Sequence, residues 1–509
     1  MDYAVELRGI SKYFGEVCAN HQVSMNIRRG EILALLGENG SGKTTLMNML
    51  SGIYYPDAGQ ILVDGNEVTI RSPKDAFRLK IGMVHQHFKL VDVFSAAENI
   101  LLGLEGTYAP KKAEEEIRAL AGKYGFDLDP RRSIQDMAVS EKQTVEIVKT
   151  LYRGADILIL DEPTAVLTPQ ETEKLFSVLR NMREDGKSIV IITHKLGEVM
   201  AISDRVTVLR KGEYINTLET AKTNPQALAD MMVGRSVTLN IRRPEPKNMM
   251  PRLRVSGLNC RDVQGVQVLK DVSFEARSGE ILGIAGIAGS GQRELCEAIA
   301  GLQSIDGGSI GYFAPEAPDK LEELVGRAPA EIRDMGVSLA FVPEDRLGMG
   351  LVGSMGMVDN MMLRSYARGR SLFTNPRPSK ELAEDVKEKL GVVTPDLETP
   401  VRRLSGGNVQ KVLLGREIAS EPSVLMAAYP VRGLDIHSSY LIYDLLNEQK
   451  EAGTAVIYVG EDLDVLLELC DRILVLCAGQ VSGIVDARTV TKEEVGLLMT
   501  QLGEVKAHG

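Results

Sequence analysis

The stretch Gly37-Glu-Asn-Gly-Ser-Gly-Lys43-Thr44 decides the fold. It follows the apolar run Ile32-Leu-Ala-Leu-Leu36 and leads into a helix-forming stretch that ends at Leu50. Glycines in such a loop let backbone N–H groups converge on phosphate oxygens, while a lysine and a hydroxyl reach the terminal phosphates and Mg²⁺. A buried strand, this loop and a helix in succession predict a phosphate-binding loop rather than an ordinary glycine-rich turn.

The loop predicts the substrate ATP and the cofactor Mg²⁺. We expect Lys43 to contact the β- and γ-phosphate oxygens and the Thr44 hydroxyl to ligate the metal. The residues expected to contact the nucleotide are Gly37, Asn39, Gly40, Ser41, Gly42, Lys43, Thr44 and Thr45.

Two adjacent carboxylates follow a second apolar run, Ile157-Leu-Ile-Leu160. Asp161 and Glu162 are therefore expected at the carboxyl edge of a strand, where α/β proteins bind their ligands. Asp161 would hold magnesium through water, and Glu162 would polarise the attacking water. Asp-Glu-Pro is also a common turn or helix-start sequence, but its place behind a phosphate loop favours the catalytic interpretation.

The second half of the chain repeats these motifs in the same order. Gly286 corresponds to Gly37, and Pro430 corresponds to Pro163. Such an ordered series predicts duplication of a domain of about 240 residues. The expected domains are 1–240 and 251–509, and they are joined by a linker over 241–250 in which prolines and charges interrupt the apolar pattern.

The fold class expected for each half is α/β. Short apolar runs such as Ser188-Ile-Val-Ile-Ile192 alternate with helical patterns, which predicts a mainly parallel sheet. The polar, helix-patterned region from 92 to 152 is expected to form a separate helical lobe.

Composition excludes several classes of function. With 59 basic and 70 acidic residues, the net charge of −11 disfavours a nucleic-acid-binding surface. The five cysteines form no C-x-x-C pair, which indicates a reduced, cytosolic protein. No apolar run approaches the roughly 18 residues that span a bilayer, so any membrane component is expected to come from another subunit.

These motifs resemble those of the ATP-binding-cassette ATPases, in the form that fuses two nucleotide-binding domains in one chain. The resemblance covers nearly the whole chain. It implies two tandem P-loop NTPase domains, each with a mainly parallel core sheet, an antiparallel β subdomain and a helical subdomain. It also implies that the domains face each other head to tail, with each ATP between the phosphate loop of one and the signature loop of the other.

Leu404-Ser-Gly-Gly-Asn408 is similar to the family's signature loop. The resemblance implies that Ser405, Gly406 and Gly407 contact the γ-phosphate that the opposite domain binds. The corresponding stretch of the first half has Ala138, which offers no hydroxyl, and Ser140, whose Cβ would hinder the close approach that glycine permits.

Three further residues match family positions. Gln86 resembles the Q-loop glutamine and His194 the switch histidine, which sense the metal and the γ-phosphate; Gln86 is thereby also an implied metal ligand. Asp435 matches the D-loop aspartate, where the first half has Thr168.

Phe14 matches the aromatic residue on which the family stacks adenine. Two alternatives stay open from the sequence: Tyr13 could supply the ring instead, or Phe14 could be a buried core residue.

The second half lacks the phosphate-binding and catalytic residues that the first half has, and the first half lacks the signature residues that the second half has. This complementary pattern predicts one competent site, built from both halves, and impaired hydrolysis at the other. The replacements are Gln292 for Lys43, Arg293 for Thr44, Glu344 for Gln86, Ala428 for Asp161, Tyr429 for Glu162 and Glu461 for His194.

The resemblance is closest to the energy-coupling subunits of bacterial importers. It implies two integral-membrane permease subunits, an extracytoplasmic substrate-binding protein as an indirect partner, and a peripheral position on the cytoplasmic face of the cell membrane. The stretches 342–346 and 433–435 look like those of importers for monosaccharides and nucleosides. The stretches 83–91 and 430–436 look more like the nucleoside branch, and the alternative is a monosaccharide importer. A soluble tandem cassette acting on ribosomes or DNA fits less well, because the linker is short and the chain acidic. In a third possibility the second half is a purely structural or regulatory module.

Overall fold

The computed structural model describes residues 3–86, 88–104, 109–165, 167–236, 239–262, 264–334, 339–342, 347, 350–364 and 375–501. His87, in the stretch 83–91, and the stretch 343–346 with Glu344, the replacement for Gln86, lie outside the described residues. The chain divides into two compact units, Met1–Leu239 and Asn240–Gly509.

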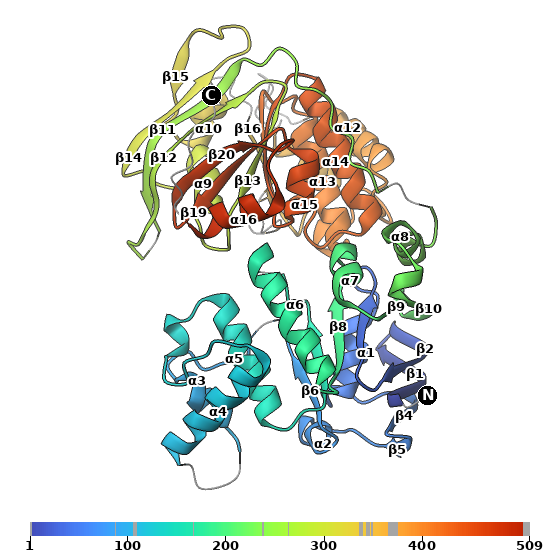
Figure 1. Ribbon diagram of the computed structural model, residues 1–509. Coiled ribbons are helices and arrows are strands. Elements are labelled where there is room, and N and C mark those ends of the chain that lie inside the picture. The colour runs from blue at the N-terminus through green and yellow to red at the C-terminus, as the bar shows by residue number, and fades with distance from the viewer. Residues whose placement is uncertain are drawn as a thin grey trace. The chain divides into compact units, whose positions relative to one another are not determined.

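The first unit contains an antiparallel sheet and a mainly parallel sheet (Figure 1). The antiparallel sheet has the order β2-β1-β4-β5 and consists of β1 (Tyr3–Phe14), β2 (Val17–Arg28), β4 (Ala58–Val63) and β5 (Asn66–Val68). The second sheet has the order β10-β9-β3-β8-β7-β6 and consists of β3 (Ile32–Leu36), β6 (Ile81–Val84), β7 (Ile157–Asp161), β8 (Ser188–Thr193), β9 (Arg205–Arg210) and β10 (Glu213–Glu219).

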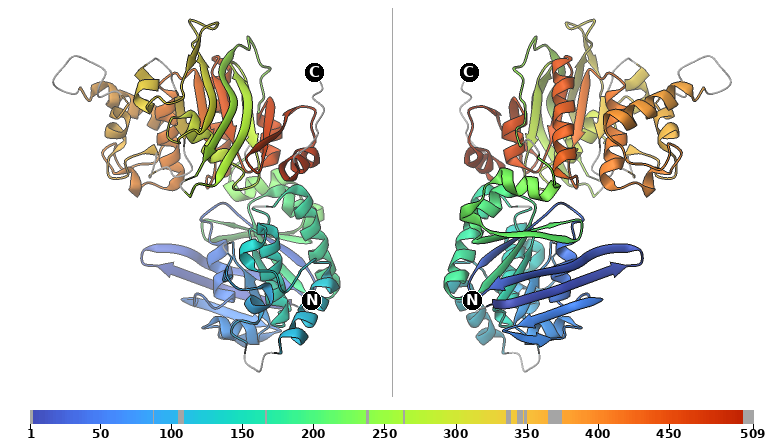
Figure 2. Two further views of the ribbon diagram at one scale, coloured as in Figure 1. Left: turned by 90° about the vertical axis from the view of Figure 1, so that its left-hand side faces the viewer. Right: turned by 90° about the vertical axis from the view of Figure 1, so that its right-hand side faces the viewer.

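Every residue of β3, β7 and β8 is buried, because one face of the sheet packs against α1 and the antiparallel sheet and the other face packs against α5, α6 and α7. In Figure 1, α3, α4 and α5 form a lobe beside this sheet, as expected for region 92–152, and Figure 2 shows the long β1–β2 hairpin. The helices are α1 (Lys43–Leu50), α2 (Pro73–Arg78), α3 (Ala96–Leu101), α4 (Pro110–Tyr124), α5 (Val139–Tyr152), α6 (Pro169–Glu184), α7 (Leu196–Ile202) and α8 (Pro225–Val233).

The second unit repeats this architecture, which confirms the expected α/β fold class with two related domains. Its antiparallel sheet, β12-β11-β14-β15, consists of β11 (Pro251–Arg261), β12 (Gln267–Arg277), β14 (Gly307–Phe313) and β15 (Leu321–Glu323). Its mainly parallel sheet, β16-β17-β18-β13-β19-β20, consists of β13 (Ile281–Ala285), β16 (Leu339–Val342), β17 (Val424–Ala428), β18 (Ala455–Val459), β19 (Arg472–Cys477) and β20 (Gln480–Asp486). The helices are α9 (Gln292–Ile299), α10 (Pro329–Asp334), α11 (Met357–Met362), α12 (Arg377–Lys389), α13 (Gly406–Ile418), α14 (Ile436–Glu451), α15 (Leu463–Leu469) and α16 (Lys492–Thr500).

The stretch 241–250, expected as a linker, is hydrogen-bonded to the second unit. Arg243 donates to the carbonyl oxygens of Leu467 and Cys470 at 2.7 and 3.0 Å. Lys450 donates to the Pro244 carbonyl and to Asp471, the latter at 2.8 Å, and its side chain is 1% exposed. These bonds give hydrogen-bond partners to the carbonyl groups of Leu467, Cys470 and Pro244 and to the charged Lys450 side chain. Without such partners, burying these polar groups would cost free energy.

Candidate functional site

The loop between β3 and α1 has the backbone that phosphate binding requires. Gly42, the last residue before α1, has φ 92°, and a Cβ there would come within 2.3 Å of the Ala19 carbonyl oxygen. A Cβ on Gly37 would lie 2.4 Å from the Leu209 carbonyl oxygen. No side chain caps the start of α1, so its first backbone N–H groups can donate hydrogen bonds to an anion such as phosphate.

Lys43 folds back into this loop. Its Nζ donates to the carbonyl oxygens of Gly37 and Glu38 at 2.7 and 2.8 Å and contacts Ser41 Oγ at 3.4 Å. Burial lowers the pKa of Lys43 to about 8, and the nearby carboxylates of Glu162 and Asp161 only partly oppose this. The ammonium therefore lies among oxygen atoms that phosphate oxygens could replace.

Thr44 and Asp161 form an oxygen-donor pair that fits Mg²⁺. The Thr44 hydroxyl donates to Asp161 Oδ1 at 3.4 Å, which brings the first turn of α1 to the end of β7. Burial raises the pKa of Asp161, and the Thr44 hydrogen bond opposes that rise. A hydroxyl and a carboxylate are the hard ligands that Mg²⁺ prefers, and a cation there would compensate the buried charge.

Gln86, Glu162 and His194 follow three neighbouring strands, β6, β7 and β8, so they meet at one edge of the sheet. Glu162 Oε2 accepts a hydrogen bond from Gln86 Nε2 at 3.0 Å, and Glu162 Oε1 lies 2.9 Å from His194 Nδ1. The hydrogen bond with His194 lowers the pKa of Glu162. Two of the three residues that the sequence assigns to catalysis, Gln86 and His194, thus contact the third, Glu162.

The backbone of Glu162 is left-handed, with φ 46°. Such a conformation is costly for a residue other than glycine and needs support from its surroundings. The N–H of Glu162 donates to the Ile192 carbonyl of β8 at 2.9 Å, and Gln143 of α5 donates to the Pro163 carbonyl at 2.6 Å. Sequence reasoning missed Gln143, because no motif marks it.

Phe14 lies at the end of β1 and is 43% exposed, so its interpretation as a buried core residue is wrong. Its ring stands edge-on to Tyr54, with centroids 5.1 Å apart, and Lys12 Nζ lies 5.5 Å from its centroid. Tyr13 is 44% exposed, and its hydroxyl lies 3.3 Å from His21 Nδ1. An exposed ring supported by a second aromatic residue is suited to stacking on a base.

The corresponding loop of the second unit holds different chemistry. Gln292 is buried, and its amide donates to the Ile287 carbonyl at 3.1 Å. Arg293, in the position of Thr44, forms an ion pair with Glu297 at 2.7 Å. Neither side chain supplies what Lys43 and Thr44 supply in the first unit.

The strand ends of the second unit are equally altered. Tyr429 keeps the left-handed backbone, with φ 51°, and burial raises its pKa to about 12, so the phenol is neutral. Ala428 offers no metal ligand, and Glu461 is paired with Arg432 at 3.6 Å. Tyr429 and Ala428 cannot polarise water or bind Mg²⁺ as the carboxylates of the first unit can, and Glu461 puts an anionic side chain where the first unit has His194.

The signature-like loop of the second unit opens α13. Ser405 caps this helix, and its Oγ accepts a hydrogen bond from Asn408 Nδ2 at 3.0 Å. Gly406 and Gly407 form the first residues of α13, and a Cβ on Gly407 would lie 3.2 Å from Leu434. Glycine there keeps the helix start open to close approach.

Ala138 occupies the equivalent cap of α5 in the first unit and provides no side-chain acceptor; Glu141 instead accepts from the Ala138 N–H at 2.7 Å. Asp435 caps α14, where its carboxylate accepts from Ser438 N and Oγ at 2.8 and 2.7 Å. Thr168 caps α6 in the same way through Glu171. Both D-loop positions therefore have a capping role whether or not they contact nucleotide.

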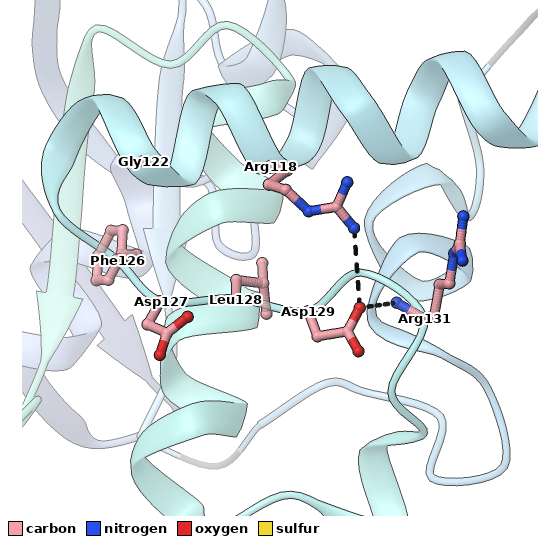
Figure 3. A pocket seen from close by; sticks show the side chains of 7 residues that line it. All are labelled: Arg118, Gly122, Phe126, Asp127, Leu128, Asp129 and Arg131. Atoms are coloured by element: carbon pink, nitrogen blue, oxygen red, sulfur yellow. Dashed lines mark hydrogen bonds and ion pairs between the residues drawn. The ribbon is translucent and has the colours of Figure 1, made fainter.

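A groove of about 490 Å³ lies in the helical lobe, away from these motifs in the sequence (Figure 3). Asp129 is 4.0 Å from Arg118 and accepts from the Arg131 N–H at 3.1 Å, while Arg131 pairs with Glu114 at 2.6 Å. Arg118, Asp129 and Arg131 are thus paired within the lobe, and the groove contains none of the residues expected to bind nucleotide.

Within the part of the chain that the structure describes, no helix is both long and apolar enough to cross a membrane.

Comparison with known proteins matches the chain twice to the family model described as "ABC transporter", over residues 20–165 and 269–430. The chain is 42% identical to the guanosine import ATP-binding protein NupO of Bacillus subtilis (strain 168), with 100% of both chains covered. It is 41% identical to the nucleoside import ATP-binding protein NupA of Lactococcus lactis subsp. cremoris (strain MG1363), with 97% of both covered. It is 39% identical to the ribose import ATP-binding protein RbsA 1 of Streptomyces avermitilis, covering 99% of this chain and 95% of that one.

Proposed function

Because the chain belongs to the ABC transporter family, we propose that it is the ATP-hydrolysing subunit of a bacterial importer that carries nucleosides. The observation that carries this proposal is the meeting of Gln86, Glu162 and His194 at the strand edge beside a complete phosphate loop. The full-length relatives named for guanosine and nucleoside import support the choice of cargo. The alternative is a monosaccharide importer, supported by the relative named for ribose import.

Each of the site residues named for the first unit has a proposed task in ATP hydrolysis. The exposed ring of Phe14 stacks on adenine, and the N–H groups at the start of α1 and Lys43 bind the phosphates. The Glu162 carboxylate orients the attacking water and accepts a share of its proton, since its lowered pKa keeps it ionised at neutral pH. His194, beside it, contacts the terminal phosphate.

Magnesium would be held by Thr44 and Asp161, with Gln86 as the third implied ligand, and would supply charge neutralisation at the β- and γ-phosphates. Without a cation, Asp161 is a buried carboxylate with a raised pKa, which disfavours its ionised form.

The second unit contributes to binding rather than to hydrolysis. We propose that Ser405, Gly406 and Gly407 contact the γ-phosphate bound by a first unit, as the family's signature loop does, and that Asp435 serves as the D-loop residue. A nucleotide that binds both units would favour the closed state over the open one, and the difference in affinity would drive the permease. Hydrolysis would then restore the open state.

The partners proposed are two integral-membrane permease subunits and, indirectly, an extracytoplasmic substrate-binding protein. The chain would act at the cytoplasmic face of the cell membrane without entering it. Selectivity for nucleosides over sugars would reside in those partners, because the ATPase residues never touch the cargo.

The test is ATP turnover together with the number of nucleotides bound per chain, for the wild type, Lys43→Ala and Ser405→Ala with the permease present. We expect both substitutions to abolish turnover, since the active site needs both units. Full turnover in Ser405→Ala would contradict a site shared by the two units. Uptake of labelled guanosine against labelled ribose by the same complex decides the cargo.

If the chain serves a nucleoside importer, it should sediment with membranes in cells that express the permease. If it is instead a soluble tandem cassette acting on ribosomes or DNA, it should not. Recovery with ribosomal RNA instead would support the competing function.

A further inference from the structure

Three polar side chains join the two strand ends that carry Glu162 and His194. Glu198, in the first turn of α7, accepts a hydrogen bond from the Thr164 hydroxyl through Oε1 and from the Thr193 hydroxyl through Oε2, the latter at 3.2 Å. Thr164 and Thr193 are each 3% exposed, and the Glu198 side chain is 13% exposed. One half-buried carboxylate thus connects the turn after β7 to the end of β8.

Lys195 completes this group. Its Nζ lies 3.2 Å from Glu198 and 3.5 Å from the Thr164 carbonyl oxygen, and its N–H donates to Thr193 Oγ1 at 3.0 Å. The carboxylate therefore has an opposite charge and two hydroxyl donors, and a network satisfied in this way holds its members in fixed positions.

The group lies next to the catalytic residues in the sequence. Thr164 is two residues after Glu162, and Thr193 immediately precedes His194. The left-handed backbone of Glu162 recurs at Tyr429 of the second unit, so the backbone conformation itself does not depend on this group. The N–H bond of Glu162 to Ile192 ties it to β8 on one side, and the Thr164–Glu198–Thr193 bridge ties the following turn to β8 on the other.

The second unit shows that the fold does not need this bridge. Val431 and Val465 stand in the positions of Thr164 and Glu198, and both pack against the apolar core of that unit. Gly460 replaces Thr193. Strands β17 and β18 and helix α15 form nonetheless. The bridge is thus absent from the unit that has lost the catalytic glutamate and histidine, and present in the unit that keeps them.

We propose that Glu198 is a positioning residue for ATP hydrolysis. Through Thr164 and Thr193 it fixes the Glu162 carboxylate and the His194 imidazole at the separation that water attack requires, without touching nucleotide. The proposal rests on the function proposed above, in which Glu162 orients the attacking water.

The test transfers the pair of the second unit into the first with Thr164→Val/Glu198→Val. We expect kcat for ATP to fall by roughly 10- to 100-fold, because small misplacements of a catalytic group cost that much, while KM for ATP and the number of bound nucleotides change by less than about two-fold. Thr164→Ser, which keeps the hydroxyl, should retain the wild-type kcat, and Thr164→Val should not.

The matched control is Thr491→Val/Glu494→Val, which removes another bonded Thr–Glu pair, at the start of α16. It should lower thermal stability and leave kcat unchanged. If the first double variant does not fold, Glu198→Gln decides, since it keeps the side-chain volume but turns one acceptor into a donor. A wild-type kcat in a folded Glu198 variant would overturn the proposal, as would equal losses in kcat in the two double variants.

Glu162→Gln separates this inference from the function on which it rests. If Glu162→Gln retains turnover, the proposed role of Glu162 fails and the bridge has no catalytic group to position. If Glu162→Gln loses turnover while the folded Glu198 variants keep it, only the positioning role is wrong.

Discussion

His194 Nδ1 lies 2.9 Å from Glu162 Oε1, across the ends of the adjacent parallel strands β8 and β7. The second carboxylate oxygen accepts from Gln86 at 3.0 Å. Both oxygens of the carboxylate are therefore engaged by side chains whose family roles concern the γ-phosphate and the metal. A nucleotide that draws Gln86 and His194 toward itself would free lone pairs on Glu162 for the attacking water, which couples correct binding to hydrolysis.

Glu162→Gln should reduce turnover by roughly 10²- to 10⁴-fold, the usual share of a general base. Binding of ATP should change little, because the amide keeps the shape of the carboxylate and the phosphates are bound elsewhere. Rapid-quench turnover and equilibrium binding of labelled ATP measure the two quantities. Glu173→Gln, an exposed position on α6, is the matched control and should behave as the wild type. Retention of most of the activity would remove Glu162 from the role of base.

The pKa of Lys43, about 8, predicts a pH dependence of nucleotide binding. Phosphate oxygens favour the ammonium, so ATP binding must restore a proton that the free protein loses as the pH rises through 8. The apparent Kd should accordingly increase above pH 8, with a limiting slope of about ten-fold per pH unit. Titration with a fluorescent ATP analogue from pH 7.5 to 9.5 measures this, in a range where the phosphate itself is fully ionised.

Lys43→Arg provides the comparison for that titration, because a guanidinium stays charged throughout this range. Whatever the absolute Kd of Lys43→Arg, that Kd should not change with pH. Equal slopes in the two proteins would show that Lys43 is not the titrating group.

The sequence predicted those parts of the fold and site that depend on local pattern. The run Ile32–Leu36 and the helix start at Lys43 are predictable because a buried strand, a glycine loop and a helix each leave a distinct local signal. Glu198 was not predictable, since its partners Thr164 and Thr193 come from other elements and no spacing marks them. Contacts of this kind depend on the strand order of the sheet, which local pattern does not contain.

Phe14 illustrates the same limit. A strand sequence does not reveal which face of a hairpin end is covered, so a core position and an exposed one were equal alternatives. The decisive contact, with Tyr54, joins β1 to the segment after α1. The hydrogen bonds of Arg243 with α15 and Cys470 were hidden for the same reason, because prolines and charges in 241–250 indicate only that regular structure stops there.

Phe14→Ala should raise KM for ATP by roughly 2- to 12-fold, as expected from the loss of about 0.5–1.5 kcal/mol of stacking, and should change kcat less. Adjacent residues of a strand point to opposite faces, so only one of Phe14 and Tyr13 can stack on the base. Tyr13→Ala, at almost the same exposure, is therefore the matched control, and steady-state kinetics with ATP distinguish the two. A larger rise in KM for Tyr13→Ala would assign the platform to Tyr13.

Gln292→Lys should not create a second hydrolytic site. The new ammonium would restore the phosphate contact that Lys43 makes, but Ala428 still offers no metal ligand, and the neutral phenol of Tyr429, with a pKa of about 12, cannot accept a proton from water. Turnover per chain should therefore equal that of the wild type, since a second site that lacks a general base would be slower by at least about 10² and would add almost nothing to the rate. The reciprocal change, Lys43→Gln, should abolish turnover, because it removes the phosphate ligand from the only unit that keeps the catalytic carboxylate. Turnover and the number of bound nucleotides, measured on both variants, test whether the second unit can hydrolyse ATP. A doubled rate in Gln292→Lys would mean that it can do so without carboxylates in the positions of Asp161 and Glu162. The assignment of one hydrolytic site per chain would then be withdrawn.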